Sequence, residues 1–82
     1  MGTKPQHNKM YRVLPGFLKD MREKANLTQR ELGKLISQPH SYIYNCEVAN
    51  RRVDITEFIL WSKACGVDPM KTFSRLLKLI EE

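Results

Sequence analysis

The first candidate for chemistry is a short helical pattern whose polar side carries hydrogen-bonding groups and almost no charge. Residues 40–47 read His-Ser-Tyr-Ile-Tyr-Asn-Cys-Glu, and Ile43 and Cys46 give the pattern an apolar side. An ordinary solvated helix face is rich in Lys and Glu, whereas short side chains with both donors and acceptors suit the edges of bases in a major groove. The alternative is a plain polar helix at the surface. The polar side consists of His40, Ser41, Tyr44 and Asn45.

A second short helix precedes this one, and a tight break separates them. Thr28 and Glu31 have the spacing of a capping box, in which the hydroxyl and the carboxylate each accept from a backbone amide. Gly33 leaves room for another helix to pack closely. Pro39 ends the first helix because it disfavours α geometry at the residue before it, yet it is tolerated where the next helix starts. The two helices therefore form a helix-turn-helix pattern.

This stretch resembles the helix-turn-helix of phage Cro and cI repressors, the XRE family, and the resemblance runs from about residue 18 to residue 77. It is similar to members that read L-T-Q-x-E-L, then P-Q-S-Y-[IV]-x-x-x-E-x-x-x-R-R-[LV]-D. It implies an all-α fold, a compact five-helix lambda-repressor-like DNA-binding domain whose second and third helices are the helix-turn-helix. The matching residues are Leu27, Thr28, Gln29, Glu31, Leu32, Pro39, His40, Ser41, Tyr42, Ile43, Glu47, Arg51, Arg52, Val53 and Asp54.

The resemblance implies that the four polar residues of the third helix read bases. Asn45 suits adenine, Tyr44 suits a thymine methyl or a phosphate, and His40 suits guanine. At the start of the second helix, the side-chain amide of Gln29 is expected to donate to a phosphate. The alternatives are a solvent-exposed Gln29, a solvated His40, and a Tyr44 that only covers apolar surface.

The loop after the third helix is basic and is expected to contact the DNA backbone. Arg51 is the stronger candidate, because we expect Arg52 to pair with Asp54. The ring of Tyr42 is expected to pack against the neighbouring helix while its hydroxyl reaches a phosphate. A solvated basic loop is the alternative. The expected phosphate contacts are Thr28, Gln29, Tyr42, Asn50, Arg51 and Arg52.

The resemblance also implies a structural ion pair between Arg22 and Glu47, behind the reading helix. Three positions at which glycine is common in the family carry Asn26, Ser37 and Ala49 here. Asparagine tolerates a left-handed conformation at low cost, and alanine tolerates it less well.

The charge of the chain is concentrated in its first part. Residues 1–52 carry ten Lys/Arg and four Asp/Glu, a net charge of +6, whereas residues 53–82 carry four and five, a net charge of −1. This asymmetry favours a polyanionic partner for the first part, and we expect double-stranded DNA. A length of 82 residues fits one small domain.

Several functions are not expected from the composition. No apolar run approaches the roughly 18 residues of a membrane span, and no signal peptide is evident. We expect a cytoplasmic, nucleoid-associated protein with two buried thiols, no metal and no cofactor. Cys46, Cys65, His7 and His40 lack the spacing of zinc ligands. No nucleophile–base pair, carboxylate cluster or phosphate-binding loop predicts an enzyme, and no place for a small-molecule effector is seen.

The remaining elements follow from periodicity and caps. Residues 1–12 are expected to form a flexible basic tail and residues 13–82 the domain. A first helix is expected over residues 15–25, with a buried stripe at Leu14, Phe17 or Leu18, Met21 and Ala25. A fourth helix is expected over residues 55–65, ended by Gly66. Its buried side should hold Ile55, Phe58, Ile59, Trp61, Ser62 and Cys65.

The fifth helix, expected over residues 69–81 with Asp68 as its N-cap, carries more apolar surface than a last helix needs. We predict an isologous two-fold homodimer through this helix and the end of the fourth. The alternatives are a helix that only completes the core, and an antitoxin or other interaction module that binds a partner protein there. The predicted interface is Leu60, Met70, Phe73, Leu76, Leu77 and Ile80.

Overall fold

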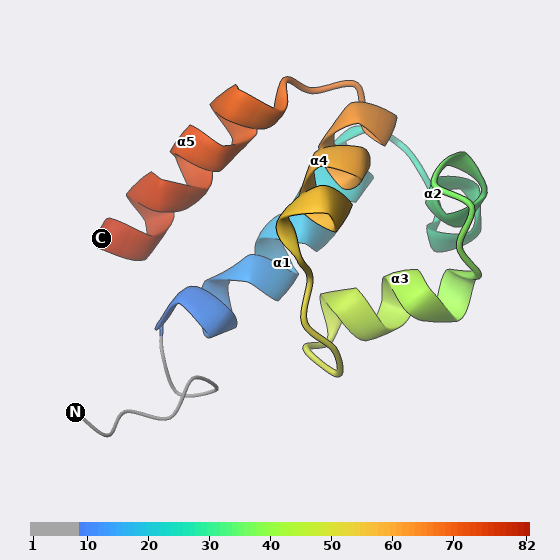
Figure 1. Ribbon diagram of the computed structural model, residues 1–82, viewed down its shortest axis with the longest axis horizontal. Helices are drawn as coiled ribbons and strands as arrows, with labels where there is room; N and C mark the ends of the chain where they lie inside the picture. Colours follow the sequence, from blue (N-terminus) through green and yellow to red (C-terminus); the bar gives the residue numbers. More distant parts are fainter. Residues whose placement is uncertain (1–8) are drawn as a thin grey trace.

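The structure is a computed structural model that describes residues 9–82, with side chains from residue 11 onward. Within this range the backbone forms five α-helices and no strand (Figure 1). The expected all-α, five-helix architecture is therefore confirmed. Most of the predicted tail, residues 1–8, lies outside the described residues. The helices are α1 (Lys9–Lys24), α2 (Gln29–Leu35), α3 (His40–Glu47), α4 (Ile55–Ala64) and α5 (Pro69–Glu81).

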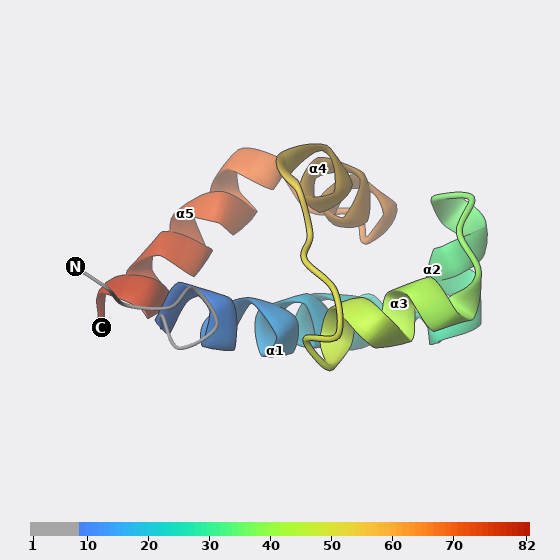
Figure 2. The ribbon, with the colours of Figure 1, turned by 60° about the horizontal axis from the view of Figure 1, so that its bottom comes forward.

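The helix-turn-helix lies at one end of the molecule and α5 at the other. α2 and α3 pack against each other, and α1 connects the two ends by packing on both α3 and α5 (Figures 1 and 2). α4 packs on α5 and α2, and a loop leads to it from the end of α3. None of the helices in residues 9–82 is both long and apolar enough to cross a membrane.

The first helix begins earlier than the sequence predicts. α1 starts at Lys9, inside the segment expected to be a tail, and Pro15 lies within it rather than at its first position. Proline has no amide hydrogen to donate to the carbonyl of Tyr11. Because this position is close to the start of α1, only one backbone hydrogen bond near the helix start is lost. Val13 and Leu14 pack against the core and stabilise these additional turns.

Trp61 lies at the centre of the core, as predicted. Its side chain is fully buried, and its indole Nε1 donates to the backbone oxygen of Leu18 at 3.2 Å. The polar atom of this large side chain is therefore satisfied. Every helix contributes to the core, whose buried hydrophobic residues are Leu18, Met21, Leu32, Ile43, Cys46, Phe58, Trp61 and Leu76.

Two residues that were predicted on the buried side of α4 are exposed. Ile55 is 63% exposed and Ile59 is 37% exposed. They lie one turn apart on a side that the packing of α5 and α2 against α4 does not cover. Cys65 follows the helix as its C-cap and is half-buried. The buried residues of α4 are Phe58, Trp61 and Ser62.

The first four helices are each followed by a residue with a left-handed backbone. The φ values are 60° at Asn26, 59° at Ser37, 65° at Ala49 and 74° at Gly66. At Gly66 the amide bonds to Lys63 and the next amide bonds to Ser62, which is the Schellman ending. Glycine is thus replaced at three of these four ends, in agreement with the family positions noted above.

Ala49→Gly is expected to raise the free energy of unfolding by about 0.5–1 kcal/mol, since a left-handed backbone strains alanine but not glycine. The greater freedom of glycine in the unfolded chain offsets part of this gain. Gly66→Ala is the matched control. An added Cβ there meets nothing within 4 Å, so only the backbone strain opposes it, and we expect a loss of similar size. Chemical denaturation followed by circular dichroism measures both; a destabilised Ala49→Gly variant would contradict the prediction.

Candidate nucleic-acid interface

The outer face of α3 carries the four predicted reading residues. His40, Ser41 and Tyr44 are exposed, and Asn45 is half-buried. With 3.6 residues per turn these positions fall on one continuous arc, and the buried Ile43 and Cys46 fall on the other side. The only carboxylate of α3 belongs to Glu47, which is buried. The outer face can therefore donate and accept hydrogen bonds without presenting a negative charge.

Val48 extends this face and was missed from the sequence. Its side chain is 42% exposed, directly after the last residue of α3. A helical projection places it between Tyr44 and Asn45, and this projection is the signal that would have identified it. An exposed valine at this position can supply apolar contact where the other side chains supply hydrogen bonds.

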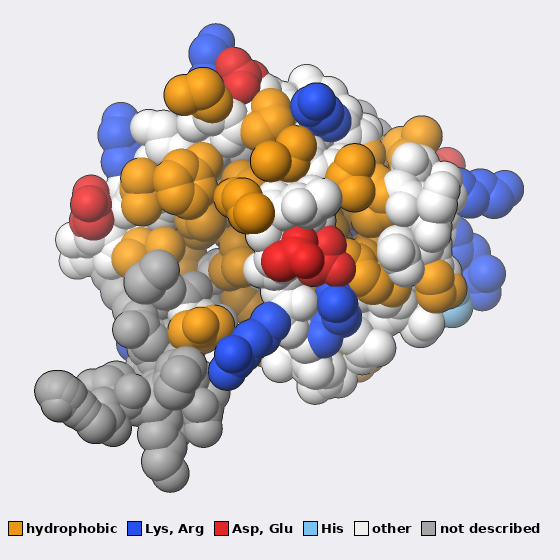
Figure 3. Space-filling model, viewed as in Figure 1, with side chains coloured by type: hydrophobic (Ala, Val, Ile, Leu, Met, Phe, Trp, Pro, Cys, Tyr) orange, Lys and Arg blue, Asp and Glu red, His pale blue; other side chains and the backbone are white. Residues whose placement is uncertain are grey.

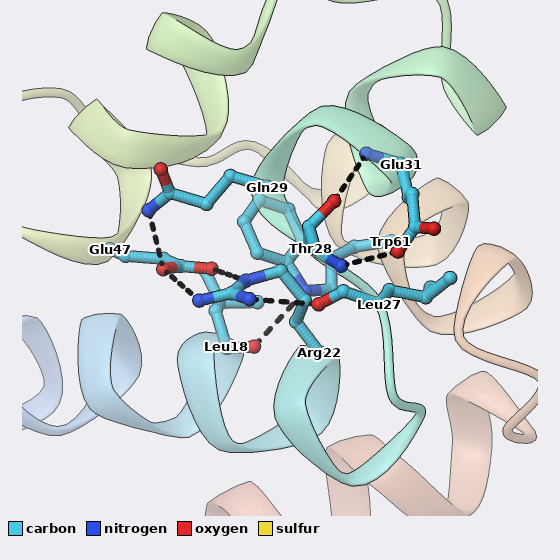
Figure 4. A network of polar contacts seen from close by, with 8 residues as sticks. All are labelled: Leu18, Arg22, Leu27, Thr28, Gln29, Glu31, Glu47 and Trp61. Atoms are coloured by element: carbon cyan, nitrogen blue, oxygen red, sulfur yellow. Dashed lines mark hydrogen bonds and ion pairs between the residues drawn. The ribbon is translucent and has the colours of Figure 1, made fainter.

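Arg22 and Glu47 form a buried ion pair behind α3, at the positions expected for it. Nε of Arg22 donates to Oε2 of Glu47 at 2.6 Å, and Nη2 donates to Oε1 at 3.0 Å. Nη1 donates to the backbone oxygen of Leu27 at 2.8 Å. The hydrogen bond to Glu47 raises the pKa of Arg22, although burial opposes this effect. One guanidinium thus ties α1 to α3 and to the start of the α2 segment (Figure 4).

Gln29 joins the same network. Its Nε2 donates to Oε1 of Glu47 at 3.1 Å, so the side-chain donor that was expected to reach a phosphate has an internal acceptor (Figure 4). The capping box is present as predicted, since Thr28 Oγ1 accepts from the amide of Glu31 at 3.1 Å and Glu31 Oε1 accepts from the amide of Thr28 at 2.8 Å. The link between Gln29 and Glu47 joins two helices and is invisible to local spacing.

Asn45 is held by a residue of the loop that follows. Nδ2 of Asn50 donates to Oδ1 of Asn45 at 3.2 Å, and the backbone amide of Asn50 donates to the carbonyl of Asn45 at 2.9 Å. Asn50, expected at a phosphate, therefore contacts one of the predicted reading side chains. This hydrogen bond uses Oδ1 of Asn45 and leaves its NH2 group able to donate.

The two arginines of the loop have partners other than those expected. Arg52 does not pair with Asp54, because Asp54 is the N-cap of α4 and its Oδ1 accepts from the amide of Glu57 at 2.8 Å. Instead the guanidinium carbon of Arg52 lies 5.4 Å from the ring centre of Tyr11. Arg51 has the acidic partner: its Nη1 donates to Oε2 of Glu57 at 3.0 Å. The expected pairing of Arg52 with Asp54, on which the preference for Arg51 as the DNA contact depended, is therefore wrong.

Tyr42 lies beneath Arg51 on the inner side of α3. It is half-buried, and the guanidinium carbon of Arg51 is 4.6 Å from its ring centre. Burial, and then the Glu57 carboxylate, raise the pKa of Tyr42. Although burial opposes it, the hydrogen bond from the Asp54 amide and the nearby side chains of Tyr42 and Arg51 hold the pKa of Glu57 below its ordinary value. Glu57 was missed as a partner, although its spacing from Asp54 is that of a capping box.

Both cysteines are free thiols; Cys46 is buried, as expected, whereas Cys65 is only half-buried. Cys46 is buried on the inner side of α3, and burial raises its pKa. Burial likewise raises the pKa of Cys65 to about 11. Both groups therefore stay protonated near neutral pH, which is typical of structural cysteines.

A group of exposed hydrophobic residues, Leu60, Met70, Phe73 and Leu77, forms what we call the α4–α5 apolar face. Their exposed fractions are 46%, 82%, 44% and 39% in that order. Figure 3 shows hydrophobic side chains gathered over α4 and α5 on this side of the molecule. Two residues of the predicted interface differ, because Leu76 is buried in the core at 7% exposure and Ile80 is half-buried against it. They lie on the inner side of α5.

The turn between α2 and α3 approaches Gly33 closely. A Cβ on this glycine would lie 2.4 Å from the backbone oxygen of Gln38, and the carbonyl of Gly33 accepts from the amide of Gln38 at 2.8 Å. The close neighbour of Gly33 is thus the turn itself rather than another helix. This contact sets the course of the chain into α3.

The family is shown by comparison with known proteins. A family model described as Helix-turn-helix matches residues 18–71, which cover α2, α3 and α4 completely. An XRE-family like protein from Pseudomonas syringae pv. tomato str. DC3000 has a similar structure, with a TM-score of 0.81, 34% sequence identity and 89% of each chain covered.

A mutant of the restriction-modification controller protein C.Esp1396I also matches, with a TM-score of 0.81 and 22% identity, covering 90% of this chain and 99% of that one. At this identity the likeness shows the fold alone. The comparison with curated proteins gives no match. The family model and the structural relative agree with the helix-turn-helix described above, and the chain belongs to the XRE family of DNA-binding helix-turn-helix transcription regulators.

Proposed function

We propose that the protein is a sequence-specific repressor that binds double-stranded DNA as a homodimer on a two-fold symmetric operator. The observation that carries this proposal is the outer face of α3, which is exposed, rich in donors and acceptors, and free of carboxylates because Glu47 is buried. His40, Ser41, Tyr44 and Asn45 would read base edges in the major groove. Occupation of a promoter would repress by excluding polymerase.

Affinity would come from the DNA backbone. The exposed, basic loop between α3 and α4 supplies Arg52, and the start of α2 supplies backbone amides together with the hydroxyl of Thr28. That hydroxyl accepts from Glu31, so its own O–H is left to donate. Contacts of this kind release counterions and give a steep dependence on salt.

The α4–α5 apolar face supports the homodimer. Its four exposed hydrophobic residues belong to α4 and α5, outside the helix-turn-helix, on a domain with a small core. An isologous contact through this face would orient two copies of α3 toward successive major grooves, about 34 Å apart. The same face would serve a partner protein if the molecule were an antitoxin.

Selection of bound duplexes from a random DNA pool at near-physiological salt tests the proposal. We expect a two-fold symmetric motif with half-sites separated by about ten base pairs. Asn45→Ala should change the bases selected, since it removes a reading group. Lys71→Ala, which removes an exposed charge from α5, should leave the motif unchanged.

Binding without any enriched motif would contradict a sequence-specific regulator and leave only electrostatic affinity. Sedimentation equilibrium of the isolated protein tests the dimer separately. A monomer at every concentration up to 100-fold above the DNA dissociation constant would contradict the homodimer and favour a partner protein on the α4–α5 apolar face.

A further inference from the structure

Arg51 connects α3 to α4 through three contacts. Its Nη1 donates to Oε2 of Glu57 at 3.0 Å, its guanidinium carbon stacks 4.6 Å from the ring centre of Tyr42, and Nη1 lies 3.7 Å from Sγ of Cys46. Tyr42 and Cys46 are on the inner side of the reading helix, and Glu57 is in the first turn of α4. A planar guanidinium suits this position because it can stack and hydrogen-bond at the same time.

Glu57 completes the connection, because each of its two carboxylate oxygens accepts a different hydrogen bond. Oε1 accepts from the amide of Asp54 at 2.8 Å and completes the capping box of α4, while Oε2 accepts from Arg51. The start of α4 and the back of α3 are thus fixed by one carboxylate and one guanidinium. This matters because the main packing partners of α3 are α2 and α1, and α4 is not among them.

The neighbouring Arg52 is in a different situation. It is exposed, and among the residues that the structure describes no carboxylate pairs with it. Its stacking on Tyr11, at 5.4 Å, leaves the hydrogen-bond donors of the guanidinium without an acidic acceptor. The guanidinium of Arg52 therefore has hydrogen-bond donors free for a ligand, whereas that of Arg51 already has a carboxylate partner.

The geometry points to a division of roles between these arginines: Arg51 is a positioning residue that sets the angle of α3 for base reading, and Arg52 binds backbone phosphate. This inference rests on the proposed DNA-binding function. It predicts that the two residues affect different properties of the complex. Loss of a phosphate contact weakens binding to all sequences and lowers the salt dependence, whereas a displaced reading helix loses the preference for the operator.

The test measures affinity of the full chain for the selected operator and for a scrambled duplex over a range of salt concentrations. Arg51→Lys keeps the positive charge but cannot stack and fork in the same way. We expect the operator-to-scrambled affinity ratio to fall about tenfold, the value of one good base contact, with an unchanged slope of log K against log salt. Arg52→Ala should lower both affinities together and reduce the slope by about 0.9 for each subunit.

Glu57→Gln sharpens the test, because glutamine still serves in a capping box but no longer pairs with Arg51 as a charge. A positioning role predicts a lower affinity ratio for this variant. A phosphate-binding role for Arg51 predicts an unchanged ratio, since the released arginine would bind the backbone of both duplexes alike. Lys71→Ala is the control for loss of a charge elsewhere, and circular dichroism establishes that each variant is folded at the assay temperature.

The inference is overturned if Arg51→Lys or Glu57→Gln keeps the full affinity ratio. It is also overturned if Arg52→Ala leaves the salt slope unchanged. These results are distinct from failure of the proposed function, in which the unaltered protein itself shows no preference for any duplex.

Discussion

Glu47→Ala is expected to lower the free energy of unfolding by about 3–5 kcal/mol, because it leaves the guanidinium of Arg22 buried without its partner. The side chains of Arg22 and Glu47 are only 10% and 2% exposed, so water cannot replace the lost carboxylate. Gln29 also loses its acceptor. In a domain of this size each kcal/mol shifts the melting temperature by about 4–8 °C, so thermal unfolding followed by circular dichroism should show a fall of at least about 12 °C.

Two further variants distinguish the cost of leaving the Arg22 charge unpaired from the cost of lost packing. Replacing both partners with hydrophobic residues, Arg22→Met with Glu47→Leu, should recover most of the loss, because a buried ion pair is often no more stable than an apolar pair of similar volume. Glu47→Gln keeps an acceptor and should lie between the single alanine variant and the unaltered protein. A melting temperature unchanged by Glu47→Ala would show that the pair does not stabilise the fold.

Local spacing was sufficient for the caps and for the choice of face on α3. The capping box of Thr28 and Glu31, the N-cap at Asp68 and the glycine ending at Gly66 all depend on residues within a few positions of each other. The family pattern added Arg22 and Glu47, which are 25 residues apart and which no local rule connects. The caps could be predicted because their residues are close in sequence, and the ion pair could be predicted because the family pattern already relates its two positions.

The sequence was insufficient where a side chain had more than one partner within reach. Asp54 is close to Arg52 in sequence, but the cap of α4 uses its carboxylate, and Arg51 takes Glu57. The place of Gln29 in the first turn of a helix suggests a side chain without a protein partner, yet it contacts Glu47 because α2 packs on α3. Such choices are decided by tertiary packing, which periodicity does not describe.

The extent of burial was also decided by packing. Ile55 and Ile59 satisfy the spacing of a buried stripe, but the neighbours of α4 cover only its other side. Leu76 satisfies the spacing of an interface residue, but it faces inward from α5. Hydrophobic periodicity gives the orientation of a stripe, whereas its width depends on how many helices surround it.

Gly33→Val is expected to lower the free energy of unfolding by about 3 kcal/mol, near the upper end of the cost of forcing extra atoms into a packed site. The first added atom would lie 2.4 Å from the backbone oxygen of Gln38. A backbone atom cannot move aside as the end of a flexible side chain can, and the same turn is held by the bond from the amide of Gln38 to the carbonyl of Gly33. Chemical denaturation measures the loss.

Gly16→Val is the matched control, because it makes the same change in another helix. An added Cβ at Gly16 meets nothing within 4 Å, and glycine is the poorer helix former, so this variant should be neutral or slightly more stable. A Gly33→Val variant as stable as Gly16→Val would show that the turn can move at little cost. If the turn cannot move at low cost, we expect the added side chain to displace Pro39 and the start of α3. Binding to the selected operator should then weaken even at temperatures where the variant is folded.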